Sequence, residues 1–328
     1  CLLQTIQNVV INHIEGASCL ACLVEQAPDI KIITSSKCVE ALMSLHPELQ
    51  NFTNWEIVDE VKKKCIGVRD IEFLLVPMIH WPGSMMCYCP QQQCLFSNDI
   101  FSQHVASSER WVDELGQYKA IQKVKEYNAN FLGHLPYLYD QTAKFIKQMP
   151  VKFVLTDHGQ CWRSTQLKLL FEEYDRFARL KFGQKVIIVF DYLYGSTKRI
   201  ASAIAEGIQQ SNVKVVVMDL KKATFTEIAT ELMDSKCFIF GCPTLNATLM
   251  PLMEGLIGYC RGLQLLKGKQ CAIFGAYGWD AQGTVDLDQR LKECQAKIER
   301  QLIWKYCEKE ETMAKAFELG QAIAEMAK

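Results

Sequence analysis

The second half of the chain alternates apolar strand-like runs with helical segments, a pattern that few folds accept. The expected strands are VIIVFD (186–191), VKVVVMDL (213–220), CFIFG (237–241), QCAIFGAY (270–277) and LIWKYC (302–307). The expected helices cover residues 198–210, 224–233, 249–259, 282–297 and a final stretch from about 310. Continuous apolar runs are typical of parallel strands that helices cover on both faces. Residues 184–328 are therefore predicted to form an α/β domain, a doubly wound parallel five-stranded sheet with ligands at the carboxyl ends of its strands.

Three loops follow strands of this predicted sheet and carry residues that suit a ligand. The first, YLYGST (192–197), joins a strand to a helix, where backbone N–H groups and the helix dipole favour an anion. It matches neither the dinucleotide nor the P-loop glycine pattern. GCPTLNA (241–247) follows the third strand, and FGAYGWDAQG (274–283) follows the fourth, with Tyr277 and Trp279 as flat surfaces for an aromatic ring system. The three loops together predict one ligand site at the edge of the sheet.

The first half of the chain alternates less regularly and is predicted to form a separate domain, residues 1–183. Its expected strands are VVIN (9–12), DIKIITS (29–35), IEFLLVP (71–77), MMCYCP (85–90), CLFSN (94–98) and KFVLTDHG (152–159). Its expected helices lie near residues 18–27, 36–45, 107–127 and 136–148, and a last helix over 161–182 leads to a boundary near 183–185. Because the chain opens at Cys1, almost directly in a strand-like run, we interpret it as lacking its natural N-terminus.

Charge and apolar content argue against two classes of partner. The 36 basic and 37 acidic residues nearly cancel, so no overall field favours nucleic acid or a membrane surface. No apolar run reaches the roughly 18–20 residues of a membrane-spanning helix. The 15 cysteines are scattered along a long chain, which favours reduced thiols in a cytoplasmic protein over a disulfide framework. Cys19 and Cys22 have the spacing of a redox or metal pair, but buried thiols on a helix are the simpler interpretation.

Several spaced segments resemble the flavodiiron proteins, also called A-type flavoproteins. The loop FGAYGW (274–279) resembles that family's FGSYGW, and the three strand-end loops together resemble flavodoxin. In the first half, VINHIEGASC (10–19) resembles the H-x-E-x-D-H segment, and HWPGSM (80–85), FSNDIFSQH (96–104) and TDHGQCWR (156–163) resemble three further family motifs. The resemblance implies a partial metallo-β-lactamase-like αββα sandwich followed by a flavodoxin-like domain.

The resemblance implies that the strand-end loops bind flavin mononucleotide (FMN). The expected contacts are Tyr192, Leu193, Tyr194, Gly195, Ser196 and Thr197 from the first loop, Pro243, Thr244, Leu245 and Asn246 from the second, and Ala276, Tyr277, Gly278 and Trp279 from the third. One position departs from the family. Tyr192 stands where the phosphate loop usually begins with Ser or Thr, so one hydrogen bond to the phosphate is expected to be lost.

The resemblance also implies an iron site in the first half. The first iron would be held by His13, Glu15, His80 and Asp99, and Asp99 would bridge to a second iron that His158 binds. Imidazole and carboxylate suit iron that cycles between oxidation states, and a bridging carboxylate holds two metals close enough to act on one small substrate. The other histidines correspond to no usual ligand of the family; they are His46, His104 and His134.

The second-iron half of this pattern departs from the family. Ala17 and Ser18 stand where the family has an aspartate and a histidine, which leaves two carboxylates where the usual site has three. The missing charge is expected to weaken a second metal substantially. Cys19 or Asp157 could substitute only from displaced positions, and Gly83 replaces an aspartate that could orient a metal ligand. A site with a single iron or zinc therefore stays open beside the diiron site.

Several functions remain open on these residues. The leading one is a flavodiiron-type oxidoreductase, in which FMN takes electrons from a rubredoxin-like or flavin-reductase donor and an iron site reduces O₂ or NO. The resemblance implies a head-to-tail homodimer, because the two centres of one chain would be too far apart. The alternatives are an FMN electron-transfer protein with a scaffold first domain and a non-catalytic subunit paired with an intact relative. Hydrolysis is disfavoured, since Glu15 replaces the histidine of hydrolytic relatives.

Overall fold

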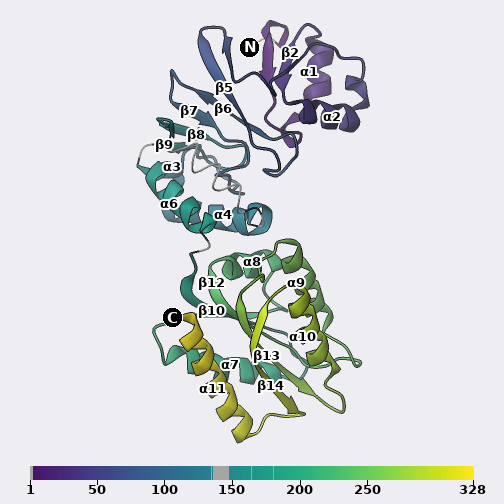
Figure 1. Ribbon diagram of the computed structural model, residues 1–328, viewed down its shortest axis with the longest axis vertical. Helices are drawn as coiled ribbons and strands as arrows, with labels where there is room; N and C mark the ends of the chain where they lie inside the picture. The colour runs from purple at the N-terminus through teal and green to yellow at the C-terminus, as the bar shows by residue number, and fades with distance from the viewer. Residues whose placement is uncertain (1–2, 134, 136–147, 164, 180) are drawn as a thin grey trace. The chain divides into compact units, whose positions relative to one another are not determined.

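The chain divides into two units, each with its own core (Figure 1). The computed structural model describes residues 3–133, 135, 148–163, 165–179 and 181–328. The first unit comprises Cys1–Tyr127 and Leu135–Ala178, and the second comprises Asn128–His134 and Arg179–Lys328. The long stretch of the second unit begins just before the boundary that the sequence predicts near residue 183. A short segment from the first half of the sequence also belongs to the second unit.

The second unit is built on a parallel sheet with the strand order β11-β10-β12-β13-β14. Its strands are β10 (Gly183–Phe190), β11 (Lys214–Asp219), β12 (Ser235–Gly241), β13 (Gln270–Tyr277) and β14 (Lys297–Lys305). The doubly wound α/β prediction is therefore confirmed. The strand order reverses between β10 and β12, so a crevice is expected outside the carboxyl ends of these two strands.

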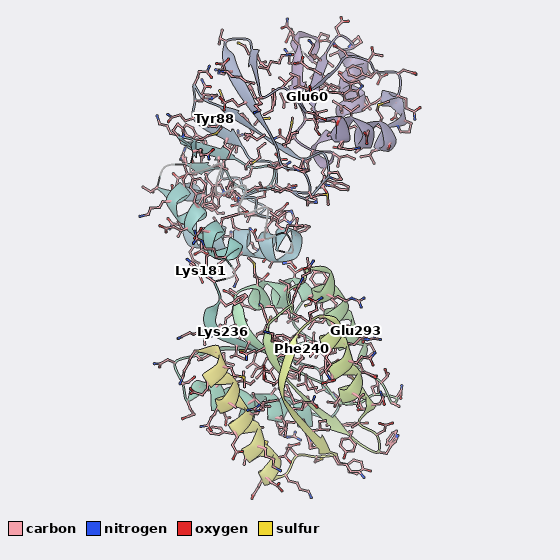
Figure 2. The ribbon with its side chains drawn as sticks, viewed as in Figure 1. Glu60, Tyr88, Lys181, Lys236, Phe240 and Glu293 are labelled. Carbon is pink, nitrogen blue, oxygen red and sulfur yellow. The ribbon has the colours of Figure 1, made fainter. Side chains whose placement is uncertain are left out.

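Helices cover both faces of this sheet because successive residues of each strand point to opposite sides. The helices are α7 (Ser196–Gln209), α8 (Phe225–Met233), α9 (Pro251–Gly262), α10 (Gln282–Glu293) and α11 (Glu310–Ala327). Along β10, Val186 and Ile188 pack with α7 and α11, whereas Ile187 and Val189 pack with α8, α9 and α10. Figure 2 shows Phe240 on β12 inside this unit, where its side chain is fully buried.

The last strand differs from the prediction in its position. A helix was expected to reach residue 297, but α10 ends at Glu293 and β14 begins at Lys297. β14 is an edge strand, paired with β13 alone, so the polar Glu299, Arg300 and Gln301 are tolerated within it. Because these polar residues interrupt the apolar run, the start of the strand cannot be predicted from apolar residues alone.

A five-residue π-helix, Asn128–Leu132, is the part of the first half that joins the second unit. Its Asn130 donates hydrogen bonds to the carbonyl of Thr226 and the hydroxyl of Thr230 on α8. Tyr259 of α9 donates from its hydroxyl to the side-chain oxygen of Asn130, at 2.6 Å. A polar contact, rather than an apolar pattern, therefore places this segment, and no local sequence pattern indicates it.

The first unit contains two sheets that share a core. A parallel sheet is formed by β1 (Asn8–Val10), β2 (Lys31–Thr34) and β3 (Trp55–Ile57). The larger sheet is formed, in this order, by β4 (Lys63–Ile66), β5 (Arg69–Leu75), β6 (Met85–Cys89), β7 (Cys94–Phe96), β8 (Phe153–Leu155) and β9 (Trp162–Arg163). Ile33 of the first sheet packs with Phe73, Met85 and Cys87 of the second. The predicted sandwich is therefore confirmed.

Helices flank the two sheets on their outer sides. The helices of this unit are α1 (Leu20–Gln26), α2 (Ser36–Leu45), α3 (Val112–Leu115), α4 (Gln117–Tyr127) and α6 (Gln166–Ala178), with 3-10 turns at Leu3–Thr5, Glu15–Ala17 and Pro47–Leu49. Leu20 and Leu42 join α1 and α2 to Ile32 of the small sheet. In Figure 1, α3 and α6 lie beside the β9 edge of the larger sheet, which both contact.

Several expectations for the first unit need correction. The helix expected over 107–127 is two helices, broken at Gly116, whose φ of +103° a helix cannot contain. The helix expected over 161–182 begins only at Gln166, because Trp162 and Arg163 form β9. The short strands β3 and β4 were missed, and the helix expected over 136–148 falls mostly outside the described residues.

Cysteine burial follows the faces of these elements. Cys87, Cys89 and Cys94 are buried, whereas Cys19 and Cys22 are exposed, contrary to the expectation of buried thiols. Helix α1 buries Leu20, so residues one position before it and two after it face away from the core. Among the described residues, no helix is both long enough and apolar enough to cross a membrane.

Candidate functional site

Four candidate ligands from separate segments of the first unit meet at one point. His13 follows β1, and Glu15 begins the 3-10 turn after it. His80 lies between β5 and β6, and Asp99 follows β7. Each offers one ligand atom, and these atoms all lie within 4.8 Å of one another. The structure thus brings together the four residues that the resemblance assigns to a first metal.

Asp99 is the centre of this cluster and is fully buried, with 0% of its side chain exposed. Its Oδ2 lies 3.1 Å from Nε2 of His13 and 3.0 Å from Nε2 of His80. Its Oδ1 lies 3.4 Å from Nε2 of His158, which enters from the loop after β8. One carboxylate therefore faces imidazoles on both oxygens, the arrangement that a bridging ligand needs.

The polar atoms of this centre are poorly satisfied by protein groups. Both oxygens of Asp99 and Nε2 of His13 are buried without a hydrogen-bond partner in the part of the chain that the structure describes. Burial raises the pKa of Asp99, but His13 and His80 lower it to well below the ordinary range, so the carboxylate stays ionised. Burial lowers the pKa of His13, and the nearby carboxylates, chiefly Asp99, outweigh this and raise it. Such orphaned atoms fit a cation, whose binding would release the imidazole protons.

Two residues outside the predicted ligand set support the ligands. Asp157 has its Oδ2 3.4 Å from Nδ1 of His13, which directs the opposite nitrogen of that ring toward Asp99. Trp81 donates from its indole nitrogen to Oε1 of Glu15, at 2.8 Å. Both are sequence neighbours of expected ligands, His158 and His80, so their place beside the site was available as a signal.

A cavity of about 450 Å³ lies at the carboxyl ends of the strands in the second unit. Residues of all three predicted loops line it: Leu193, Tyr194, Ser196, Thr197, Pro243, Thr244, Leu245, Asn246, Ala276, Tyr277, Gly278 and Trp279. Arg199, Tyr306 and Cys307 also line it and were not predicted. The last two belong to the loop after β14, whose end meets the same edge of the sheet as the other strand ends, so the topology alone could have suggested them.

One end of the cavity is formed by the start of helix α7. Gly195 caps this helix in the left-handed conformation, with φ +90°. Ser196 and Thr197 follow it and are buried, and Trp304 donates from its indole nitrogen to Oγ of Ser196 at 3.0 Å. Free backbone N–H groups and the dipole of a 14-residue helix make this end favourable for a phosphate.

Exposed aromatic rings surround the rest of the cavity. Trp279 leaves 85% of its side chain exposed, and the rings of Tyr194 and Tyr306 are exposed as well. The backbone N–H of Tyr306 donates to the carbonyl of Tyr277 at 2.7 Å, which ties the β14 loop to the aromatic loop. Flat apolar surfaces next to an anion-binding helix start suit a phosphorylated aromatic ligand.

Comparison with known proteins shows the family to which the chain belongs. The model of the ODP family β-lactamases matches residues 1–159, and the flavodoxin model matches residues 188–320. The rubredoxin-oxygen oxidoreductase of Megalodesulfovibrio gigas is 31% identical over 86% of this chain and 70% of its own length. The crystal structure of the flavodiiron protein from Giardia intestinalis superposes with a TM-score of 0.94 at 34% identity, covering 100% of this chain and 81% of that one. The chain belongs to the flavodiiron protein family.

A further relative of this flavodiiron chain is named for its substrate. The nitric oxide reductase of Moorella thermoacetica is 27% identical over 96% of this chain and 80% of its own length. Membership also gives the two sites their expected cofactors. The flavodoxin part implies FMN, and His13, Glu15, His80 and Asp99 form a group that could hold a metal.

The residues expected on the second-metal side lie as follows. Ala17 is buried where the family pattern has an aspartate, and the neighbouring Ser18 and Cys19 are exposed. His158 still faces Oδ1 of Asp99. Beyond it lies His104, whose ring centroid is 5.1 Å from that of His158. Burial and His158 together lower the pKa of His104.

Two other departures from the flavodiiron pattern have structural correlates. A Cβ added at Gly83 would lie 2.5 Å from the backbone nitrogen of Cys38, at the start of α2, so an aspartate has no room there. Tyr192 lies outside the cavity lining, with its ring 4.2 Å from Nζ of Lys221. Gly195 also lies outside the lining and acts through the turn that it makes.

Of the remaining histidines, His46 lies away from the cluster and His104 lies beside His158. His46 ends α2 and donates its backbone N–H to Leu42 within that helix. His104 packs edge to face against Tyr127, with ring centroids 4.9 Å apart. His134 falls outside the described residues.

Proposed function

We propose that this flavodiiron chain is an oxidoreductase that moves electrons from FMN to a non-haem metal site where O₂ or NO is reduced. The observation that carries this proposal is the fully buried Asp99 carboxylate, on whose two oxygens three imidazoles converge. Such a cluster has no evident structural purpose in a protein core, because burying ionisable groups is costly even when they face one another. The cavity for a phosphorylated aromatic ligand on the flavodoxin unit supplies the second half of the argument.

Different residues around the cavity would contact different parts of FMN. The start of α7, with Ser196 and Thr197, binds the phosphate through N–H and hydroxyl groups. Tyr277 and Trp279 would offer flat surfaces to the ring system, and the Pro243–Asn246 loop lines the same cavity. Tyr192 and Gly195 shape the first loop without facing the ligand.

In the first unit we assign more candidate ligands to one metal ion than to a second. We assign His13, Glu15, His80 and Asp99 to one metal ion, while Asp157 and Trp81 keep two of these ligands oriented. When bound, FMN would carry the electrons and iron would take up O₂ or NO, which is chemistry that the side chains cannot perform alone.

We further propose that this chain holds one tightly bound metal rather than two. A second ion would have only His158 and one oxygen of Asp99. Cys19 is exposed, and Asp157 faces His13, so neither stands in for the missing ligands. With Ala17 in place of a carboxylate, the second site also lacks the negative charge that offsets a divalent ion.

The presence of Ala17 and Ser18 in place of ligands also favours a second candidate function. If no second metal is needed, the chain could serve as an FMN electron-transfer protein or as a non-catalytic subunit beside an intact relative. For either role we propose a rubredoxin-like or flavin-reductase donor in the cytoplasm. For the catalytic role we propose a head-to-tail homodimer that brings the FMN of one chain to the metal of another.

Metal analysis and gas consumption test these proposals together. The purified chain, loaded with FMN and ferrous iron and then desalted, is expected to keep about one metal per chain by mass spectrometry. NADH-driven consumption of O₂ or NO with an added flavin reductase decides between an enzyme and a scaffold. Two retained irons would contradict the single-metal proposal, and FMN without iron or gas consumption would favour the electron-transfer role. Ala17→Asp combined with Ser18→His is expected to raise the metal content toward two per chain.

A further inference from the structure

An arginine on the first turns of α7 lines the flavin cavity and is held there by a carboxylate from a different loop. Nε of Arg199 donates to Oε1 of Glu308, which follows Cys307 in the loop after β14. Arg199 leaves 53% of its side chain exposed, whereas Glu308 leaves only 10% exposed. Glu308 is much the less exposed partner and therefore the more fixed one, so it determines where the guanidinium lies.

The guanidinium lies over the turn that begins the helix. A Cβ added at Gly195 would be 3.2 Å from a terminal guanidinium nitrogen of Arg199. Ser196, the next residue, is one of the cavity-lining hydroxyls and accepts a hydrogen bond from Trp304. Five N–H donors of a guanidinium exceed what one carboxylate contact uses, so donors remain for an anion at the helix start.

The pair also remains charged under ordinary conditions. Arg199 is the main cause that lowers the pKa of Glu308 to about 2, so this carboxylate is ionised throughout the neutral range. A side-chain hydrogen bond with Ser196 lowers the same pKa further. A buried carboxylate with one oxygen bound to Arg199 strongly disfavours any position in which the guanidinium leaves it.

We propose that Arg199 recognises the phosphate of FMN, that Glu308 positions it, and that this pair makes the cavity select FMN over the unphosphorylated flavin riboflavin. The inference rests on the proposed FMN function and adds a residue to it. Tyr192 offers no hydroxyl to the phosphate, because its ring lies outside the cavity lining. A cationic guanidinium at the same end supplies a charge-assisted contact in its place.

Riboflavin is the probe that separates phosphate recognition from general damage to the cavity. Dissociation constants for FMN and for riboflavin are measured on the full chain by quenching of flavin fluorescence. Arg199→Met is expected to lower the affinity for FMN by about tenfold to a hundredfold, which is the effect of losing a charge-assisted hydrogen bond. The affinity for riboflavin is expected to stay unchanged. Arg199→Lys is expected to recover part of the loss, and Glu308→Gln to weaken FMN by a smaller factor, again without effect on riboflavin.

Lys198→Met is the matched control. Lys198 lies on the same helical turn and carries the same charge, but it is exposed and lies outside the cavity lining. If Lys198→Met and Arg199→Met lower the affinity for FMN equally, the effect comes from the overall positive charge of the helix start. The inference is then wrong. Equal losses of FMN and riboflavin in Arg199→Met would show a structural role and would also overturn it. A wild-type chain that binds neither flavin would overturn the proposed function itself, and this inference with it.

Discussion

The flavin cavity and the metal centre bring their predicted residues together in different ways. Around the cavity, the loops after β10, β12 and β13 all supply lining residues, and the single departure, Tyr192, turns its ring aside. At the metal centre one set of ligands converges, and we propose that Ala17 and Ser18 leave the other set incomplete. Each site is built on a sheet of its own unit, so changes in one need not disturb the other.

The largest expected effect comes from the residue at the middle of the metal centre. Asp99→Asn removes the carboxylate that faces three imidazoles, and we expect metal affinity to fall by at least about a hundredfold. FMN affinity should not change, because the cavity belongs to the other unit. Metal content by mass spectrometry and flavin content by absorbance measure both on one sample. If FMN is lost together with the metal, the independence of the two sites is disproved.

The next effect tests whether the metal side can return to the family pattern. Gly83→Asp restores a family residue, but its Cβ would lie 2.5 Å from the backbone nitrogen of Cys38 and 2.9 Å from its Cβ. We expect this overpacking to destabilise the first unit by about 1–3 kcal/mol. Thermal unfolding followed by circular dichroism measures the loss. Gly16→Asp is a suitable control, because nothing lies within 4 Å of a Cβ added at Gly16. Equal stability of the two variants would mean that α2 can move away from Gly83.

The sequence predicts the sheet of the second unit and the place of its ligand site, but it does not predict several contacts around the two sites. Apolar runs and the loops between them fix the doubly wound sheet and the edge where its ligand lies, because burial dictates both. The strand β14 was misplaced, since an edge strand tolerates Glu299 and Arg300. Arg199 was missed because its partner Glu308 is distant in sequence, and the close packing of Gly83 on α2 is likewise a tertiary contact. Pairings of this kind leave no local pattern.

A third test compares buried charges in the two units. Nζ of Lys269 in the second unit donates to the carbonyls of Leu232 and Met233, far along the sheet from the cavity, and only 6% of this residue is exposed. Burial lowers the pKa of Lys269 from 10.5 to about 7. Between these values the unfolded chain binds more protons than the folded one, so Lys269 makes stability rise with pH.

Lys269→Met should remove that dependence. Between pH 7 and pH 9 the wild type is expected to gain about 2 kcal/mol of stability relative to the variant. Hydrogen exchange of the β13 amides reports the second unit directly. Lys267→Met, at an exposed lysine two positions earlier, is expected to follow the wild type. If Lys269→Met and the wild type run parallel with pH, Lys269 is charged in the fold. Lys269 would then be a charged buried group, as Asp99 is in the first unit.

The smallest expected effect concerns the aromatic rim of the cavity. Trp279→Ala removes a ring that is 85% exposed, so the stability of the fold should be unaffected. A stacked ring contributes roughly 1–1.5 kcal/mol, and we therefore expect FMN affinity to fall by about tenfold. Riboflavin should weaken by the same factor, since the two flavins share the ring system and differ only at the phosphate. Tyr118→Ala, at an exposed aromatic residue of the first unit, is the control and should change neither affinity. A loss confined to FMN would place Trp279 at the phosphate end, beside Arg199, and would reverse the orientation that we assign to the ligand in the cavity.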